Sequence, residues 1–267
     1  MANAKDVDIP AGKAILILGD TGSGKTTQLL TLPGKKFVYV FDPNALSSLQ
    51  GHDVDYETFL PDRLQLKLVS LKAGVNPSGP VQKNKGVEVY KEWENHFEKA
   101  LSSGFFDSYD TIGLDSGTTF LDMIMDGVLA INGRGGMWPQ QDDYGPQMLA
   151  FTQVMRTLTS LGKRVYVTGH TEYIKDEIIN RVFNVPMMTG RLKKKIPLLF
   201  SEVLHAEAVN DGKGTVKYMI QTKPDRLNPT IRTSLKGLDP FIDVTIDFNK
   251  PIEGQGLGGF ILRATKK

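Results

Sequence analysis

The sequence predicts an α/β fold in which a mostly parallel sheet is covered by helices. Four short, largely apolar runs, at residues 14–18, 37–41, 109–114 and 164–168, alternate with segments of helical pattern. A run that is apolar at successive positions is typical of a strand buried on both faces of a parallel sheet. Strands that alternate with helices indicate βαβ units, which build α/β domains.

Helices are predicted between these strands. Residues 25–32 follow a glycine-rich turn and end at a Pro-Gly pair, which stops a helix. Residues 89–102 carry apolar side chains at helical spacing with charged residues between them, and residues 147–161 form a third predicted helix. Elsewhere we expect a short strand at 64–71 and loops at 72–86 and 131–146.

The C-terminal part of the chain predicts a β-hairpin extension and a tail. Residues 202–209 and 215–221 are strand-like runs separated by an Asn-Asp-Gly turn, which is typical of a hairpin. Residues 171–196 are polar and basic with scattered apolar side chains, which indicates a loop. Since no repeat or linker divides the sequence, we expect one domain over residues 1–248 and a glycine-rich, basic tail at 249–267.

Composition and charge exclude several classes of protein. The chain has 267 residues, with 32 Lys and Arg against 30 Asp and Glu. The resulting charge of +2 is too small for binding nucleic acid through bulk charge alone. The absence of cysteine excludes disulfides, cysteine-ligated zinc and thiol catalysis. The sequence has neither a signal-peptide pattern nor an apolar run of about 20 residues, so we expect a cytoplasmic protein without membrane association.

The segment GDTGSGKT at residues 19–26 matches the P-loop pattern G-x-x-x-x-G-K-[ST] between a predicted strand and a predicted helix. Its glycines let backbone amides curl around phosphate oxygens, and the helix N-terminus adds positive potential. Lys25 would reach the β- and γ-phosphates of ATP, and the Thr26 hydroxyl would hold Mg²⁺. The alternative is a glycine-rich turn that binds no ligand. The predicted nucleotide-binding residues are Gly19, Asp20, Thr21, Gly22, Ser23, Gly24, Lys25, Thr26 and Thr27.

Three polar residues follow predicted strands at what should be the same edge of the sheet. Asp115 is a candidate second ligand for Mg²⁺, with helix capping as the alternative role. Asp42 is a candidate for orienting the water that attacks ATP, and a turn-forming role before a proline is equally open. His170 is a candidate sensor of the γ-phosphate, and a structural histidine in a turn is the alternative.

The succession of the P-loop, Asp42, the Asp115-Ser116 pair and His170 resembles the RecA-like ATPase core. Over residues 10–248 the chain looks most like phage-encoded AAA-type proteins of the single-strand annealing recombinase or recombination-mediator family. This resemblance implies an ATP- and Mg²⁺-dependent ATPase in the bacterial host cytoplasm. It also implies self-association into a ring or filament, binding of single-stranded DNA, and a single-strand-binding protein as a further partner.

The same resemblance implies further sites. Two loops, at residues 126–146 and 171–195, would face DNA with basic and aromatic side chains that suit single strands. Lys223 and Arg226 would reach the γ-phosphate of a neighbouring subunit. The alternative for all of them is an exposed or core-packed side chain without such a role. The nucleic-acid candidates are Arg134, Trp138, Tyr173, Lys175, Arg181, Arg191, Lys193, Lys194 and Lys195.

The sequence therefore favours a RecA-like ATPase that acts on single-stranded DNA in recombination, annealing or repair. One alternative is an ATPase that uses nucleotide as a switch for assembly or partner binding and contacts no DNA, which the near-neutral charge favours. A P-loop kinase is a further alternative, although few of the basic residues are the arginines that a kinase lid requires. The sequence has no recognisable polymerisation motif for strand exchange. A role in annealing or loading therefore fits the sequence better than strand exchange of the RecA type.

Overall fold

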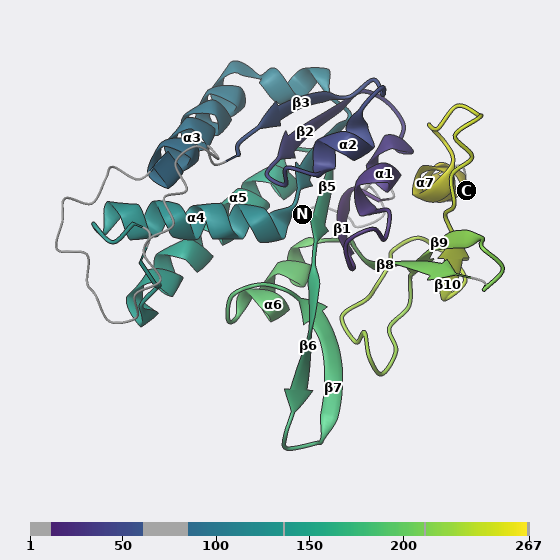
Figure 1. Ribbon diagram of the computed structural model, residues 1–267. Helices are drawn as coiled ribbons and strands as arrows, with labels where there is room; N and C mark the ends of the chain where they lie inside the picture. Colours follow the sequence, from purple (N-terminus) through teal and green to yellow (C-terminus); the bar gives the residue numbers. More distant parts are fainter. Residues whose placement is uncertain (1–11, 61–84, 136, 211, 266–267) are drawn as a thin grey trace, which may run out of the picture.

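The computed structural model describes residues 12–60, 85–135, 137–210 and 212–265. The strands of its central sheet are β1 (Ala14–Leu18), β2 (Lys36–Val40), β3 (Asp55–Thr58), β4 (Thr111–Asp115), β5 (Arg164–Gly169), β8 (Glu202–Asn210), β9 (Val216–Gln221) and β10 (Phe241–Asp243). They form an 8-stranded sheet in the order β10-β9-β8-β1-β5-β4-β2-β3 (Figure 1). The strands from β8 to β3 are parallel, and β9 and β10 continue the sheet as antiparallel neighbours.

Helices cover both faces of this sheet. They are α1 (Lys25–Leu30), α2 (Ala45–Leu49), α3 (Lys85–Ser103), α4 (Gly117–Ile131), α5 (Tyr144–Ser160), α6 (Leu192–Lys195) and α7 (Gly256–Thr265). In β1, Leu16 and Leu18 join the core cluster formed with α3, α4 and α5, whereas Ile15 and Ile17 join the cluster formed with α1, α2 and α7. Successive apolar residues therefore bury opposite faces of the strand, and the predicted α/β class is confirmed.

The carboxyl ends of β1, β5, β4 and β2 meet at one edge of the sheet. Leu18 at the end of β1 pairs with Gly169 of β5, and Val40 at the end of β2 pairs with Asp115 of β4. Residues that follow these strands are therefore brought together at this edge, although they are far apart in the sequence.

The predicted hairpin extension is confirmed, because β8 and β9 pair antiparallel along their length. β3 was not predicted, and it pairs with β2 at the sheet edge. The predicted strand at 64–71, and most of the loop predicted at 72–86, lie outside the described residues. Within the part of the chain that the structure describes, no helix has the length and apolar character needed to cross a membrane.

The prediction of a loop at 171–196 is wrong. This segment contains a separate 2-stranded sheet, β6 (Thr171–Asp176) paired with β7 (Arg181–Pro186), followed by α6. At its turn, the Asp176 carboxylate accepts hydrogen bonds from the amides of Ile178 and Ile179. The hairpin projects from the body of the molecule (Figure 1), so it needs few apolar side chains, and the sequence pattern was too polar to indicate strands.

The predicted tail at 249–267 differs from the structure, and the predicted loop at 131–146 is shorter than expected because α5 starts at Tyr144. Residues 256–265 form α7, whose Leu257 and Ile261 are buried against α1 and the sheet. A Cβ on Gly258 would lie 1.8 Å from the Thr31 carbonyl oxygen, so this glycine permits close helix packing rather than flexibility. In the loop at 131–146, a 3₁₀ turn at Gln141–Asp143 leads directly into α5.

Candidate functional site

The P-loop connects β1 to α1, as predicted. Gly22 and Gly24 have φ angles of 80° and 83°, a left-handed conformation that glycine adopts without strain. A Cβ on Gly19 would lie 2.2 Å from the Ala206 carbonyl oxygen of β8, so only glycine fits there. The Lys25 ammonium donates hydrogen bonds to the carbonyl oxygens of Gly19 and Asp20, at 2.9 Å and 2.7 Å. Burial lowers the pKa of Lys25, against the opposing effect of the carboxylates of Asp115, Asp20 and Asp42.

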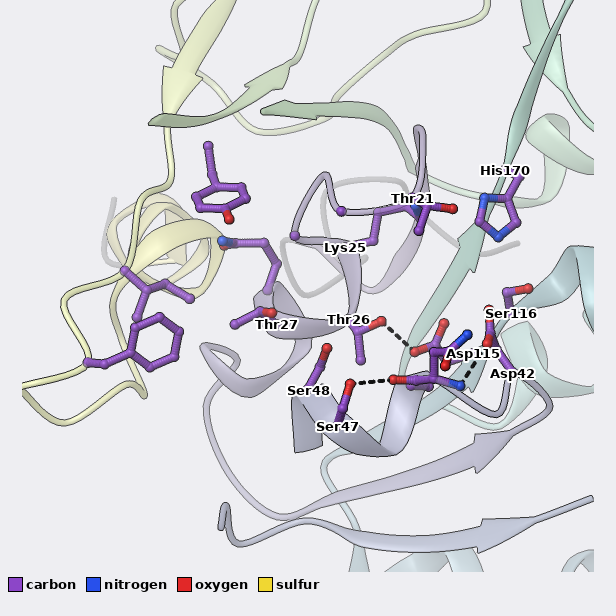
Figure 2. Close-up of a pocket in the computed structure, with 18 residues that line it drawn as sticks. Thr21, Lys25, Thr26, Thr27, Asp42, Ser47, Ser48, Asp115, Ser116 and His170 are labelled. Carbon is purple, nitrogen blue, oxygen red and sulfur yellow. Dashed lines mark hydrogen bonds between the residues drawn. The ribbon is translucent and has the colours of Figure 1, made fainter. Parts of the chain in front are cut away.

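A pocket of about 400 Å³ opens at this edge of the sheet (Figure 2). It brings the P-loop together with Asp42, Asp115 and His170, three residues that the sequence placed at the same edge. The lining residues are Thr21, Gly22, Gly24, Lys25, Thr26, Thr27, Gln28, Asp42, Asn44, Ala45, Ser47, Ser48, Asp115, Ser116, His170, Tyr218, Ile246 and Phe248.

Asp115 ends β4 and contacts the first turn of α1. One of its carboxylate oxygens accepts a hydrogen bond of 2.6 Å from the Thr26 hydroxyl (Figure 2). The other accepts one from the Thr168 hydroxyl of β5. Burial raises the pKa of Asp115, while these two hydrogen bonds favour the charged carboxylate. A hydroxyl and a carboxylate in contact fit Mg²⁺, which prefers oxygen ligands.

The alternative role for Asp115, capping a helix, belongs to its neighbour. Ser116 is the N-cap of α4, and its hydroxyl accepts a hydrogen bond from the Thr119 amide. The Asp115 side chain is therefore left to the pocket and to its two threonine partners.

Asp42 and His170 follow β2 and β5, the two strands that flank β4 in the sheet, and both line the pocket with Asp115 (Figure 2). The Asp42 carboxylate accepts a hydrogen bond of 2.9 Å from the Asn44 amide, so it forms the turn and also lines the pocket. The His170 amide donates to the Thr118 hydroxyl at 3.0 Å, and its half-buried ring lines the pocket. Burial, and secondly the positive charge of Lys25, lower the pKa of His170, which favours its neutral imidazole.

None of the nucleic-acid candidates lines this pocket. Arg134 forms an ion pair with the fully buried Asp143, which is a structural role. Trp138 is 91% exposed beside a shallow groove at the end of α4, and Tyr173 is exposed on β6. The Arg181 guanidinium donates to the Arg226 carbonyl and lies over the Phe183 ring.

The remaining basic candidates divide into paired and unpaired side chains. Lys175 pairs with Glu177, and Lys193 pairs with Glu172 at 3.0 Å. The side chains that are exposed and form no ion pair with any described residue are Arg191, Lys194, Lys195, Lys223 and Arg226. Lys223 and Arg226 follow β9 and do not line the pocket of their own chain.

Sequence reasoning missed two groups of residues that line the pocket. The first group comes from α1, α2 and the turn before α2, and it comprises Gln28, Asn44, Ser47 and Ser48. The second group comes from β9 and the segment after β10, and it comprises Tyr218, Ile246 and Phe248. The one available signal was the alternation of apolar residues at 244, 246 and 248, which indicates an extended segment with one side facing inward.

Comparison with known protein families identifies the family of this chain. A family model described as an AAA domain matches residues 11–231. The chain belongs to the AAA domain family. Membership identifies it as a P-loop ATPase domain, and the predicted α/β fold with a P-loop is confirmed. The match also supports the prediction of nucleotide binding.

Two solved structures are similar to this AAA domain. The flagellar accessory protein FlaH from Methanocaldococcus jannaschii is 14% identical, with 90% of this chain and 87% of that chain covered and a TM-score of 0.40. A KaiC-like protein from Pyrococcus horikoshii is 12% identical, with 80% and 79% covered and a TM-score of 0.40. No protein of curated function matches the sequence.

Proposed function

We propose that this AAA domain is a Mg²⁺-dependent ATPase of the RecA-like class that acts on single-stranded DNA in recombination, annealing or repair. The contact between the Thr26 hydroxyl and the Asp115 carboxylate carries the ATPase part of the proposal. It joins the P-loop to the end of a neighbouring strand, which is where a P-loop NTPase holds its metal ion.

Each residue of the pocket has a distinct task in this proposal. Lys25 would leave its carbonyl partners, Gly19 and Asp20, and donate to the β- and γ-phosphates. Thr26 and Asp115 would hold Mg²⁺, which neutralises charge on the phosphate oxygens when bound. Asp42 would accept a hydrogen bond from the attacking water and orient it. The neutral His170 can donate one ring N–H to a γ-phosphate oxygen without competing with Lys25.

Binding of single-stranded DNA rests on α6 and the hairpin β6–β7. The exposed Arg191, Lys194 and Lys195 can neutralise phosphates, and Tyr173 offers an exposed ring on which a base could stack. β6 starts at Thr171, directly after His170 of the pocket. The residue proposed to contact the γ-phosphate is therefore next to the hairpin in the chain. Arg134 takes no part, because its guanidinium is paired with buried Asp143.

The proposal includes self-association into a ring or filament, which two cations support. Lys223 and Arg226 are exposed cations that their own pocket does not use. In a ring or filament, such cations could complete the γ-phosphate site of a neighbouring subunit. The account predicts that Lys223 or Arg226 variants lose turnover while they still bind nucleotide.

The test measures ATP turnover with and without single-stranded DNA, and DNA affinity across a salt series. Single-stranded DNA should stimulate turnover in the wild type. The double variant Lys194→Glu/Lys195→Glu should lose the stimulation and reduce the slope of DNA affinity against salt, because each phosphate contact contributes about one unit to that slope. The matched control is Lys91→Glu/Lys99→Glu, two exposed lysines on α3.

The possible outcomes separate the two halves of the proposal. ATP turnover without any affinity for DNA would leave the ATPase and favour a nucleotide-switched assembly protein. Phosphoryl transfer to an acceptor other than water would favour a kinase. Absence of ATP binding would contradict the proposal as a whole.

A further inference from the structure

The pocket continues beyond the phosphate-binding residues, away from Asp115. Asp115 and His170 mark the end where the metal and the γ-phosphate would lie, because the metal bridges the β- and γ-phosphates. A nucleoside attached to the α-phosphate must therefore extend toward the opposite end. In Figure 2 the chain segment on the side of the P-loop away from Asp115 is the one that follows β10, and the apolar and aromatic lining residues from β9 and this segment are Tyr218, Ile246 and Phe248.

The P-loop itself fixes the position of the Tyr218 ring. A Cβ on Gly24 would lie 3.0 Å from ring atom Cδ1 of Tyr218, so the ring packs directly against this glycine. Because β9 runs beside the segment after β10, the Val244 amide donates to the Tyr218 carbonyl at 2.8 Å. The Tyr218 amide donates in turn to the Thr245 hydroxyl at 3.0 Å. These hydrogen bonds hold the start of the segment 244–248 beside β9.

Gln28 joins this segment to α1. Its side-chain amide donates to the Val244 carbonyl at 2.8 Å, and its amide oxygen accepts from the Leu257 amide at 2.9 Å. Both ends of the Gln28 side chain are therefore occupied, and it is not available to a ligand. Phe248, by contrast, is 65% exposed and lines the pocket, so its ring has a free face for a ligand.

We propose that Tyr218, Ile246 and Phe248 form a base subsite that holds a purine by stacking and does not distinguish adenine from guanine. The inference rests on the proposed function, since it places the base of the same nucleotide. The only polar side-chain group on these three residues is the Tyr218 hydroxyl. A hydroxyl donates or accepts, so it suits the 6-amino group of adenine and the 6-oxo group of guanine equally. Stacking on an aromatic face is likewise tolerant of base identity, and it favours the larger purine ring.

The experiment is a set of calorimetric titrations with the magnesium complexes of non-hydrolysable analogues of ATP, GTP, CTP and UTP, and with inorganic tripolyphosphate. In the wild type, ATP and GTP should bind within about threefold of each other, and CTP and UTP about tenfold more weakly. Phe248→Ala should weaken ATP and GTP by about 5- to 150-fold, the range expected for loss of one aromatic stacking partner. Tripolyphosphate should bind the wild type and Phe248→Ala equally, because it has no base.

Two further variants make the result specific. Phe248→Trp retains an aromatic face and should restore ATP affinity. Phe241→Ala removes another exposed phenylalanine, from β10, that does not line the pocket, and it should leave ATP affinity unchanged. A preference of more than about 30-fold for ATP over GTP would overturn the inference, because it requires polar contacts to the base edge.

Failure of this inference is distinguishable from failure of the proposed function. If tripolyphosphate binds and Phe248→Ala leaves ATP affinity unchanged, the phosphate site stands and the base subsite is wrong. If neither the nucleotides nor tripolyphosphate bind, both are wrong.

Discussion

The two ends of the pocket are built in different ways. The phosphate end consists of consecutive residues, 19–27, and of side chains at the ends of neighbouring strands, and it is tightly hydrogen-bonded. The base end consists of Tyr218, Ile246 and Phe248, which come from distant parts of the chain. Lys25 is only 7% exposed, whereas Phe248 is 65% exposed. The phosphate end therefore has a fixed arrangement, and the base end has room to adapt.

This difference follows from what each end must recognise. Phosphate oxygens carry charge and need donors whose positions are fixed before binding, which a short loop on a buried strand supplies. A base needs an apolar surface, which many combinations of residues can provide. Local sequence therefore encodes the first end, and only tertiary structure assembles the second.

The largest expected effect comes from Lys25→Ala at the phosphate end. Removal of this ammonium should lower ATP turnover by about 10²- to 10³-fold, because a fixed donor to the phosphates is lost. Turnover at saturating ATP measures the effect, and circular dichroism verifies the fold. Lys99→Ala, an exposed lysine on α3, is the control. Equal turnover in Lys25→Ala and the wild type would show that the phosphate end lies elsewhere.

Asp115→Asn separates metal binding from nucleotide binding. The amide keeps the size of the side chain but loses the charge that would hold Mg²⁺, so turnover should fall by about 10²-fold. Magnesium-free ADP should bind as it does to the wild type, because Lys25 and the P-loop amides remain. Titration of turnover against magnesium concentration measures the loss. A variant with the same magnesium dependence as the wild type would remove Asp115 from the metal site.

Gln28→Leu tests the link between the two ends. The change leaves the Val244 carbonyl and the Leu257 amide without their partner. Two unsatisfied buried groups should lower the free energy of unfolding by about 2–4 kcal/mol. Urea denaturation measures it, with Gln153→Leu on the exposed face of α5 as the matched control. Equal losses in the two variants would mean that Gln28 does not join the segment 244–248 to α1.

The smallest effect concerns pH. Burial is the main cause of the lowered pKa of both His170 and His205, so the unfolded chain binds more protons than the folded chain near pH 6.5. Stability should therefore be full above pH 6.5 and fall as the pH decreases below it. His170→Gln should lose less stability than the wild type between pH 7 and pH 5.5. Parallel unfolding curves for both proteins across this range would contradict the assignment.

The sequence predicted the elements whose signal is local. The strand at 14–18, the P-loop and the strand-end residues Asp42, Asp115 and His170 each follow from a short pattern and the topology of a parallel sheet. The roles of Asp42 and His170 stay predictions. The hairpin at 171–186 could not be predicted from apolar periodicity, because it projects from the core and exposes Ile178 and Ile179.

The glycine content led to a wrong prediction at the C-terminal end of the chain, because a glycine there permits close packing. The glycines of residues 249–267 indicated a tail, yet Gly258 lies so close to the Thr31 carbonyl that α7 packs on α1. Gln28, within α1, gave no signal of its contacts to Val244 and Leu257, since those contacts join residues more than 200 positions apart. Such long-range contacts determine the base end and are invisible to local patterns.

A crystal structure with Mg²⁺ and a non-hydrolysable ATP analogue tests the central claim most directly. The account predicts a triphosphate wrapped by the backbone amides of residues 19–26, with Thr26 and Asp115 at the metal and the adenine against Phe248. A triphosphate bound away from Lys25, or a nucleotide that runs along the pocket in the opposite direction, would contradict it.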